Sequence, residues 1–111
     1  FSVSFSGKNY DPANRMSEFK LFAEINDHSR GCLRTGSAAL NLAYMAEGRF
    51  SGCWGKANKS WDIAAGLLIA ELAGAKIITK PFDEKNYQSS YLACNAMVFD
   101  VIHEKVTPVI F

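Results

Sequence analysis

The sequence predicts a single layered α/β domain, an α/β sandwich in which helices cover both faces of a mixed β-sheet. Short runs of β-forming residues alternate with segments of helical periodicity, in the order β-α-β-α-β-α-β-β-α-β. A length of 111 residues suffices for one hydrophobic core but not for two, and a hydrophobic content of 49% excludes a disordered chain. We therefore expect one compact unit across residues 1–111.

The chain opens with a predicted strand followed by a helix. Residues 1–5 (FSVSF) alternate in character and are rich in β-forming residues, and Gly7 ends the run. Asp11 is a suitable N-cap for a helix that has Pro12 at its first position. That helix is expected to bury one apolar stripe, made of Met16, Phe19, Phe22 and Ala23.

A second helix lies between two further predicted strands. Residues 32–34 (CLR) predict a short strand, and residues 49–54 (RFSGCW) predict another. The helix between them begins at Thr35 or Ser37, both of which can accept from free N–H groups, and ends at Gly48.

A nearly wholly apolar helix comes next, after a predicted polar loop at residues 55–60. It runs from about Asp62, the expected N-cap, to Ala73, with Gly74 just past its end. Because Glu71 is the only other charged side chain in this segment, the helix is expected to be buried on all sides. The remaining predicted elements are a strand (75–79), a turn (80–86), a strand (91–95), a helix capped by Asn95 and running to about Lys105, and a terminal strand or tail (107–111).

Charge and cysteine content exclude several classes of protein. A formal net charge of +1 gives no electrostatic reason to expect binding to nucleic acid or to an acidic membrane surface. The longest apolar run is about half as long as a membrane span requires. Three widely spaced cysteines, Cys32, Cys53 and Cys94, fit neither a disulfide framework nor a CxxC metal site. We expect free thiols and a cytoplasmic location.

Two positions are candidates for a binding role, and each has a structural alternative. Asp62 could cap its helix, which contributes ~1 kcal/mol to stability, or its carboxylate could bind a ligand at the N-terminal end of a buried helix. The small residues of TGSAA (35–39) could let a ligand approach backbone N–H groups, or could serve close helix packing. Arg30 and Arg34 could meet a phosphate or simply face solvent, and Lys8 has no assignable role.

Three segments together resemble the inositol monophosphatase family. WDIAAGLLIAELAGAK (61–76) is similar to a family motif W-D-x-A-A-G followed by an apolar helix and a glycine pair. RTGSAALNLAYMAEGRFSGCW (34–54) is similar to the stretch upstream of that motif, and YLACNAMVFDVI (91–102) to the closing strand and helix.

The resemblance implies a Mg²⁺-dependent phosphomonoesterase with an αβαβα fold that is commonly a homodimer. Matched to the family motifs, Asp62 would be a metal ligand near the substrate hydroxyls, and Gly36, Ser37 and Ala38 would line the substrate pocket. The implied substrate is a small phosphorylated sugar or polyol such as inositol phosphate.

One departure from the family pattern leaves the substrate open. Gly55 stands seven residues before Asp62, where inositol-specific members have a glutamate, and Lys56 beside it could suit a second phosphate. The alternatives are a fructose-1,6-bisphosphatase, a 3′-phosphonucleotide phosphatase of the same fold, and a non-catalytic regulatory module similar to the bacterial extragenic suppressor proteins.

A second departure concerns the metal site. The family's other metal-binding motifs, D-P-[IL]-D-G-T and an upstream G-E-E, occur nowhere in the chain. The chain therefore resembles only the C-terminal portion of a family enzyme, without the N-terminal metal-binding half. One carboxylate is too few for a two-metal mechanism, so we expect this chain alone to be inactive, with an apolar surface that promotes homo-oligomers.

Overall fold

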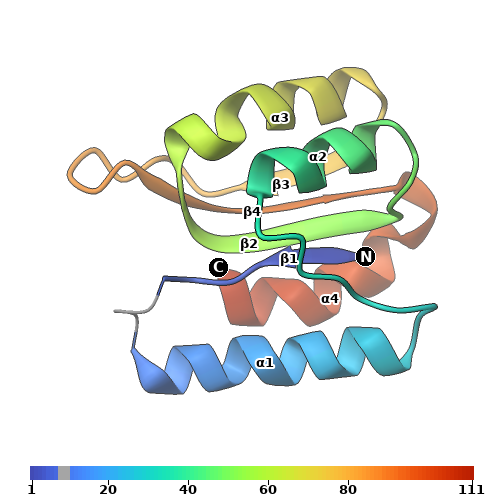
Figure 1. The fold of residues 1–111 in the computed structure, drawn as a ribbon, viewed down its shortest axis with the longest axis horizontal. Coiled ribbons are helices and arrows are strands. Elements are labelled where there is room, and N and C mark those ends of the chain that lie inside the picture. Colours follow the sequence, from blue (N-terminus) through green and yellow to red (C-terminus); the bar gives the residue numbers. More distant parts are fainter. Residues whose placement is uncertain (8–10) are drawn as a thin grey trace.

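The fold is a three-layer α/β arrangement with a mixed sheet between two pairs of helices. The structure, a computed structural model, describes residues 1–7 and 11–111. Figure 1 shows α2 and α3 on one face of the sheet and α1 and α4 on the other. The predicted α/β class, with helices on both faces of a mixed sheet, is confirmed.

Four strands form the sheet in the order β1-β2-β4-β3. They are β1 (Ser2–Ser4), β2 (Gly52–Lys59), β3 (Lys76–Thr79) and β4 (Gln88–Cys94). β1 is parallel to β2, whereas β4 is antiparallel to both β2 and β3. The predicted strand at residues 32–34 is reduced to a single parallel bridge between Leu33 and Ser2.

The polar segment 55–60, predicted to be a loop, is the second half of β2. Its residues pair with β4 as far as Lys59, which lies opposite Gln88. Between Gly55 and Asn58 the register shifts, because three steps on β2 oppose two steps on β4. This is a β-bulge with one extra residue, and Ala57 within it has a positive φ of 53°. The bulge breaks the alternation that would have predicted a strand.

The helices are α1 (Pro12–Asp27), α2 (Ala38–Ala46), α3 (Ser60–Leu72) and α4 (Phe99–Ile110), with a 3₁₀ turn at Ala96–Val98. Asp11 caps α1 by accepting from the Ala13 N–H at 3.4 Å, as predicted, and Asn95 caps the 3₁₀ turn that leads into α4. The C-terminal ends of α2 and α3 are followed by Gly48 and Gly74, both with positive φ, as predicted.

The predicted terminal strand or tail is instead the last turn of α4. Three apolar side chains one helical turn apart, Ile102, Val106 and Ile110, are buried against the sheet. Burial of this stripe keeps the segment helical although Pro108 removes one backbone donor near the helix end.

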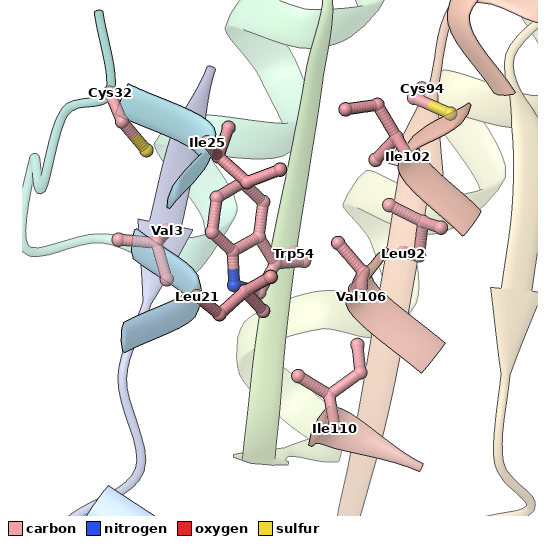
Figure 2. Close-up of a cluster of buried hydrophobic side chains, with 10 residues drawn as sticks. All are labelled: Val3, Leu21, Ile25, Cys32, Trp54, Leu92, Cys94, Ile102, Val106 and Ile110. Atoms are coloured by element: carbon pink, nitrogen blue, oxygen red, sulfur yellow. The ribbon is translucent and has the colours of Figure 1, made fainter. Parts of the chain in front are cut away.

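One hydrophobic cluster lies between the sheet and the pair α1 and α4. Figure 2 shows the Trp54 indole of β2 extending toward Leu21 and Ile25 of α1. The predicted stripe of α1 is correct only for Phe22, which packs against this cluster. Met16, Phe19 and Ala23 are exposed, and the helix buries Leu21 and Ile25 instead. A second cluster fills the space between the sheet and the pair α2 and α3, and includes Leu42, Cys53, Ile63 and Tyr91.

All three cysteines are free thiols, as predicted, and all three are buried. Burial, together with the neighbouring Cys94, raises the pKa of the Cys53 thiol to about 12. None of the described helices is both long enough and apolar enough to cross a membrane.

The helix α3 is not buried on all sides, which corrects the prediction. Ile63 and Ala70 face the core, but the outer side chains Leu68, Ile69 and Leu72 are 56%, 53% and 80% exposed. Two helices that share one face of a four-stranded sheet each leave an outer surface uncovered within the described residues.

A close contact at Gly66 sets the distance between α2 and α3. A Cβ on Gly66 would lie 2.7 Å from the Cβ of Leu42, an atom that cannot rotate away from the α2 backbone. Leu42 is completely buried. The absence of a side chain at position 66 therefore allows the two helices to approach each other side by side.

We predict that Gly66→Ala lowers the free energy of unfolding by up to about 2 kcal/mol. Helix propensity alone would make alanine about 1 kcal/mol more stable, but overpacking a core typically costs about 1–3 kcal/mol. The measurement is urea unfolding, with Ala65→Gly at an exposed position of the same helix as the control for propensity. A stabilised Gly66→Ala protein would show that the two helices are not in tight contact there.

Candidate functional site

A pocket of about 250 Å³ lies where the starts of α2 and α3 meet the sheet. It brings together Asp62 and the segment 36–38, which sequence analysis had selected from separate motifs. The pocket is lined by Val3, Ser4, Phe5, Arg34, Gly36, Ser37, Ala38, Ala39, Asn58 and Asp62.

Asp62 lies in the first turn of α3, but it is not the N-cap that was predicted. The helix begins two residues earlier, at Ser60, with Lys59 in the cap position and no side-chain cap hydrogen bond. The Asp62 carboxylate is exposed and accepts no hydrogen bond from the described residues. A negative charge in the first turn is favoured by the helix dipole, and this carboxylate remains available to a cation or a donor.

The segment 36–38 forms the turn into α2 and lines the pocket. Gly36 has a φ of +89°, a conformation that other residues adopt only with strain. Ser37 is the N-cap and its hydroxyl accepts from the Leu40 N–H at 3.1 Å, which confirms one of the two predicted caps. The N–H groups of Ala38 and Ala39, in the first turn, have no partner within the helix.

A buried asparagine holds this turn against the sheet. Asn41 is completely buried, and its carboxamide nitrogen donates to the Ser4 hydroxyl at 3.2 Å. Its carboxamide oxygen accepts from the Thr35 hydroxyl at 2.6 Å. Because Thr35 precedes the pocket turn and Ser4 lies on β1, this chain of hydrogen bonds fixes one wall of the pocket.

Asn58 lines the pocket although sequence analysis did not select it. It lies just after the β2 bulge, and its carboxamide oxygen is buried without a hydrogen-bond partner among the described residues. The sequence predicted a polar loop at residues 55–60, which assigns no face of the sheet to Asn58. Pairing with β4 across the bulge places Asn58 on the same face as Gly55, whereas an uninterrupted strand would place them on opposite faces.

The Arg34 side chain lines the pocket, whereas Lys56 does not. The Arg34 guanidinium lies 5.9 Å from the centre of the Phe5 ring. Lys56 is directed to the opposite face of the sheet, where its ammonium donates to the Val109 carbonyl at 2.7 Å and to the Asn14 carboxamide at 3.4 Å. Arg30 lies outside the pocket, and Lys8 lies outside the described residues.

The pocket offers one carboxylate to a metal ion. Within residues 1–7 and 11–111, no three histidine, cysteine, aspartate or glutamate side chains lie close enough to hold a metal together. Asp62 and nearby neutral oxygens fit part of the coordination of a hard cation such as Mg²⁺, which binds through one or two carboxylates and keeps several waters.

The fold and pocket define a layered α/β protein with a polar pocket at the starts of two helices. A model of the inositol monophosphatase family matches residues 2–109. The chain belongs to the inositol monophosphatase family, as its motifs had indicated.

The relatives that the chain resembles include proteins named as phosphatases and proteins named as Nus factors. The Inositol-1-monophosphatase of Caulobacter vibrioides is 36% identical over 91 residues, which are 78% of this chain and 35% of that protein. Phosphatase IMPL1, chloroplastic, of Arabidopsis thaliana is 32% identical over 93 residues, 83% of this chain and 25% of that protein. Nus factor SuhB of Pseudomonas aeruginosa is 37% identical over 57 residues, 51% of this chain and 21% of that protein. The chain thus spans about a third or less of these relatives.

Solved structures of the family share the fold. SuhB of Mycobacterium tuberculosis superimposes with a TM-score of 0.80 at 27% identity, over 97% of this chain and 40% of that one. The inositol monophosphatase of Anabaena (Nostoc) superimposes with a TM-score of 0.77 at 28% identity, over 96% of this chain and 44% of that one.

Proposed function

We propose that this chain forms the substrate-side, C-terminal portion of a Mg²⁺-dependent phosphomonoesterase that acts on a small phosphorylated sugar or polyol. The observation that supports this most directly is the shared pocket of Asp62 and the α2 turn at residues 36–38. One wall provides a carboxylate for a cation, and the other provides N–H groups for an anion or hydroxyl. A phosphate ester bound through a cation requires a carboxylate to hold the cation and donors to bind the oxygens of the ester.

In this proposal Asp62 holds Mg²⁺ through its carboxylate. A bound Mg²⁺ supplies charge stabilisation to phosphoryl oxygens and activates a water molecule. The Ala38 and Ala39 N–H groups, at the positive end of α2, bind an oxygen of the substrate. The Gly36 turn leaves room for that approach, because a Cβ there would have no atom within 4 Å.

The remaining metal ligands are proposed to come from the parts of a family protein that this chain does not span. The pocket contains Asp62 as its only carboxylate among the described residues. The 111-residue chain alone is therefore expected to give no Mg²⁺-dependent turnover.

The second candidate is a regulatory module that does not catalyse. It is supported by the similarity to proteins named Nus factor SuhB, such as that of Pseudomonas aeruginosa. An assay of phosphate release separates the two candidates.

We predict that this chain supports catalysis when it replaces the matching segment of the Caulobacter vibrioides enzyme. The chimera should release phosphate from at least one of inositol monophosphate, fructose 1,6-bisphosphate and a 3′-phosphonucleotide. Asp62→Asn should lower the Mg²⁺-dependent rate by at least about 100-fold, because the remaining amide cannot balance the metal charge.

The matched control is Asp100→Asn, an exposed aspartate in the first turn of α4 and far from the pocket in sequence and layer. The rate of this variant should stay within about threefold of the rate of the unsubstituted chimera, which is a change of less than 1 kcal/mol in the activation free energy. A chimera that circular dichroism shows to be folded, but that releases no phosphate from any of the three substrates, favours the regulatory candidate.

The exposed face of α3 is proposed to bind a second copy of the chain. Leu68, Ile69 and Leu72 project from the outer side of the helix. A groove beside them is lined by Leu67, Ile77 and Phe82, together with Glu71 and Thr79, so apolar side chains extend toward β3 with two polar side chains among them. Exposed apolar patches rimmed by polar residues typically mark a protein interface.

We predict that the 111-residue chain self-associates and that Leu72→Lys weakens this association by at least about tenfold. A lysine at a position that is 80% exposed keeps the monomer folded but places a charge in the interface. Sedimentation velocity over a range of concentrations measures the effect. Val101→Lys, at an exposed apolar position on α4, should leave association unchanged; a monomeric wild-type chain at high concentration would contradict the proposal.

A further inference from the structure

The first turn of α3 has no side-chain cap and is held instead by the loop between β3 and β4, residues 80–87. The Ser60 N–H donates to the Tyr87 carbonyl at 2.8 Å, and the Lys59 ammonium donates to the Asn86 carbonyl at 2.7 Å. Figure 1 shows this loop extending beyond the sheet at the end where α3 begins. Because the first N–H groups of a helix have no partner within it, the loop does here what a capping side chain does elsewhere.

The loop is closed on itself by Asp83. The Asp83 N–H donates to the Gln88 carbonyl at 2.9 Å, and the Asp83 carbonyl accepts from the Tyr87 N–H at 2.6 Å. The Asp83 carboxylate accepts from the Lys85 N–H at 2.8 Å and from the Asn86 carboxamide at 2.7 Å. An aspartate that accepts from the backbone two residues later is a common turn-forming device. The loop is therefore a fixed support for the helix that contacts it.

Tyr87 adopts a backbone conformation that is unfavourable for its residue type. Its φ is 54°, in the left-handed region, where a Cβ crowds the following carbonyl and glycine is the residue without penalty. Residues strained in this way persist where the surrounding structure fixes them, and they concentrate at sites whose geometry matters. A glycine would close the same loop without strain, which indicates that the tyrosine side chain itself has a role.

The ring of Tyr87 lies against Trp61, the residue that precedes Asp62. The two ring centres are 6.2 Å apart, with an angle of 42° between the planes. Both rings are largely exposed, so this contact lies outside the hydrophobic core. The Lys59 ammonium lies 5.7 Å from the centre of the Trp61 ring. Aromatic and cation–π contacts of this kind are attractive beyond the area they bury, so they join the loop to the first turn of α3.

The first turn is the part of α3 whose position depends on the loop. Ile63 is completely buried and anchors the helix from that residue onward. Residues 60–62 are less buried, and the end of a helix without a cap tends to fray. Unwinding of this turn would carry Asp62 away from the wall of the pocket that it lines.

We propose that Tyr87 is a positioning residue whose ring and carbonyl keep the first turn of α3 wound and thereby keep Asp62 at the pocket. The inference rests on the proposed function for the role of Asp62, and it adds to that site a residue outside the pocket. Tyr87 does not line the pocket, and it acts through Ser60 and Trp61.

Three variants of the 111-residue chain test this role. Tyr87→Gly removes the ring, keeps the carbonyl and relieves the strained backbone. Tyr87→Phe keeps the ring and is the conservative variant that should behave as wild type. Glu84→Gly places a glycine at an exposed position of the same loop and is the matched control for loop flexibility.

Two NMR measurements report on the turn and on Asp62 separately. The first, made without metal, is the order parameter of the Trp61 and Asp62 amides and of the Trp61 indole, with the buried Trp54 indole as an internal reference. The second is the Mg²⁺ concentration that produces half of the amide shift changes at residues 60–63.

In Tyr87→Gly the order parameters of the Trp61 and Asp62 amides should fall from about 0.85 to about 0.6 or less, with the Trp54 indole unchanged. The half-saturating Mg²⁺ concentration should rise at least about threefold, because apparent affinity falls with the fraction of molecules in which the turn is formed. Tyr87→Phe and Glu84→Gly should match the wild type in both measurements.

The outcomes separate this inference from the proposed function. Unchanged order parameters in Tyr87→Gly, an equal loss of order in Glu84→Gly, or a mobile turn with unchanged Mg²⁺ affinity would overturn the positioning role of Tyr87. A wild-type chain that shows no Mg²⁺ shift at residues 60–63 would overturn the proposed role of Asp62. In that case the order parameters, which need no metal, still decide whether Tyr87 holds the turn.

Discussion

The close contact between α2 and α3 is the constraint on which the pocket depends. Gly66 lets the α3 backbone approach Leu42 so closely that a single Cβ would not fit. Because both helices start at the same end of the sheet, this proximity places Ser37 and Asp62 around one pocket. Two residues that are 25 positions apart in the sequence become opposite walls of the same site only through this packing.

The sheet supplies the remaining wall, and it does so through an irregularity. A regular β2 would direct Asn58 toward α1 and α4, on the face where Lys56 contacts Val109 and Asn14. The bulge at Ala57 instead brings Asn58 to the pocket side and leaves Lys56 on the other. A local break in strand geometry thus decides which polar group lines the pocket, a common use of bulges near functional sites.

Residue types and short-range spacing correctly predicted several of the helix caps, the glycines at helix ends and the fold class. The capping of α2 by Ser37, the glycines after α2 and α3, and the layered α/β class follow from residue type and short-range spacing. The role of residues 55–60 and the end of α4 could not be predicted in this way. The first depends on pairing with β4 across a bulge, and the second on burial of Val106 and Ile110, which outweighs the effect of Pro108.

The family motifs pointed to Asp62 and residues 36–38 as one site, and the structure places them around one pocket. Whether that pocket holds a cation is tested most directly by adding trace Mn²⁺, a paramagnetic cation that also prefers oxygen ligands, to the 111-residue chain with inorganic phosphate. We predict that NMR signals of residues 36–39 and of the first turn of α3 broaden together and that the broadening is lost in Asp62→Asn. Broadening centred elsewhere, for example on the acidic turn at Asp83 and Glu84, or unchanged in Asp62→Asn, would contradict it.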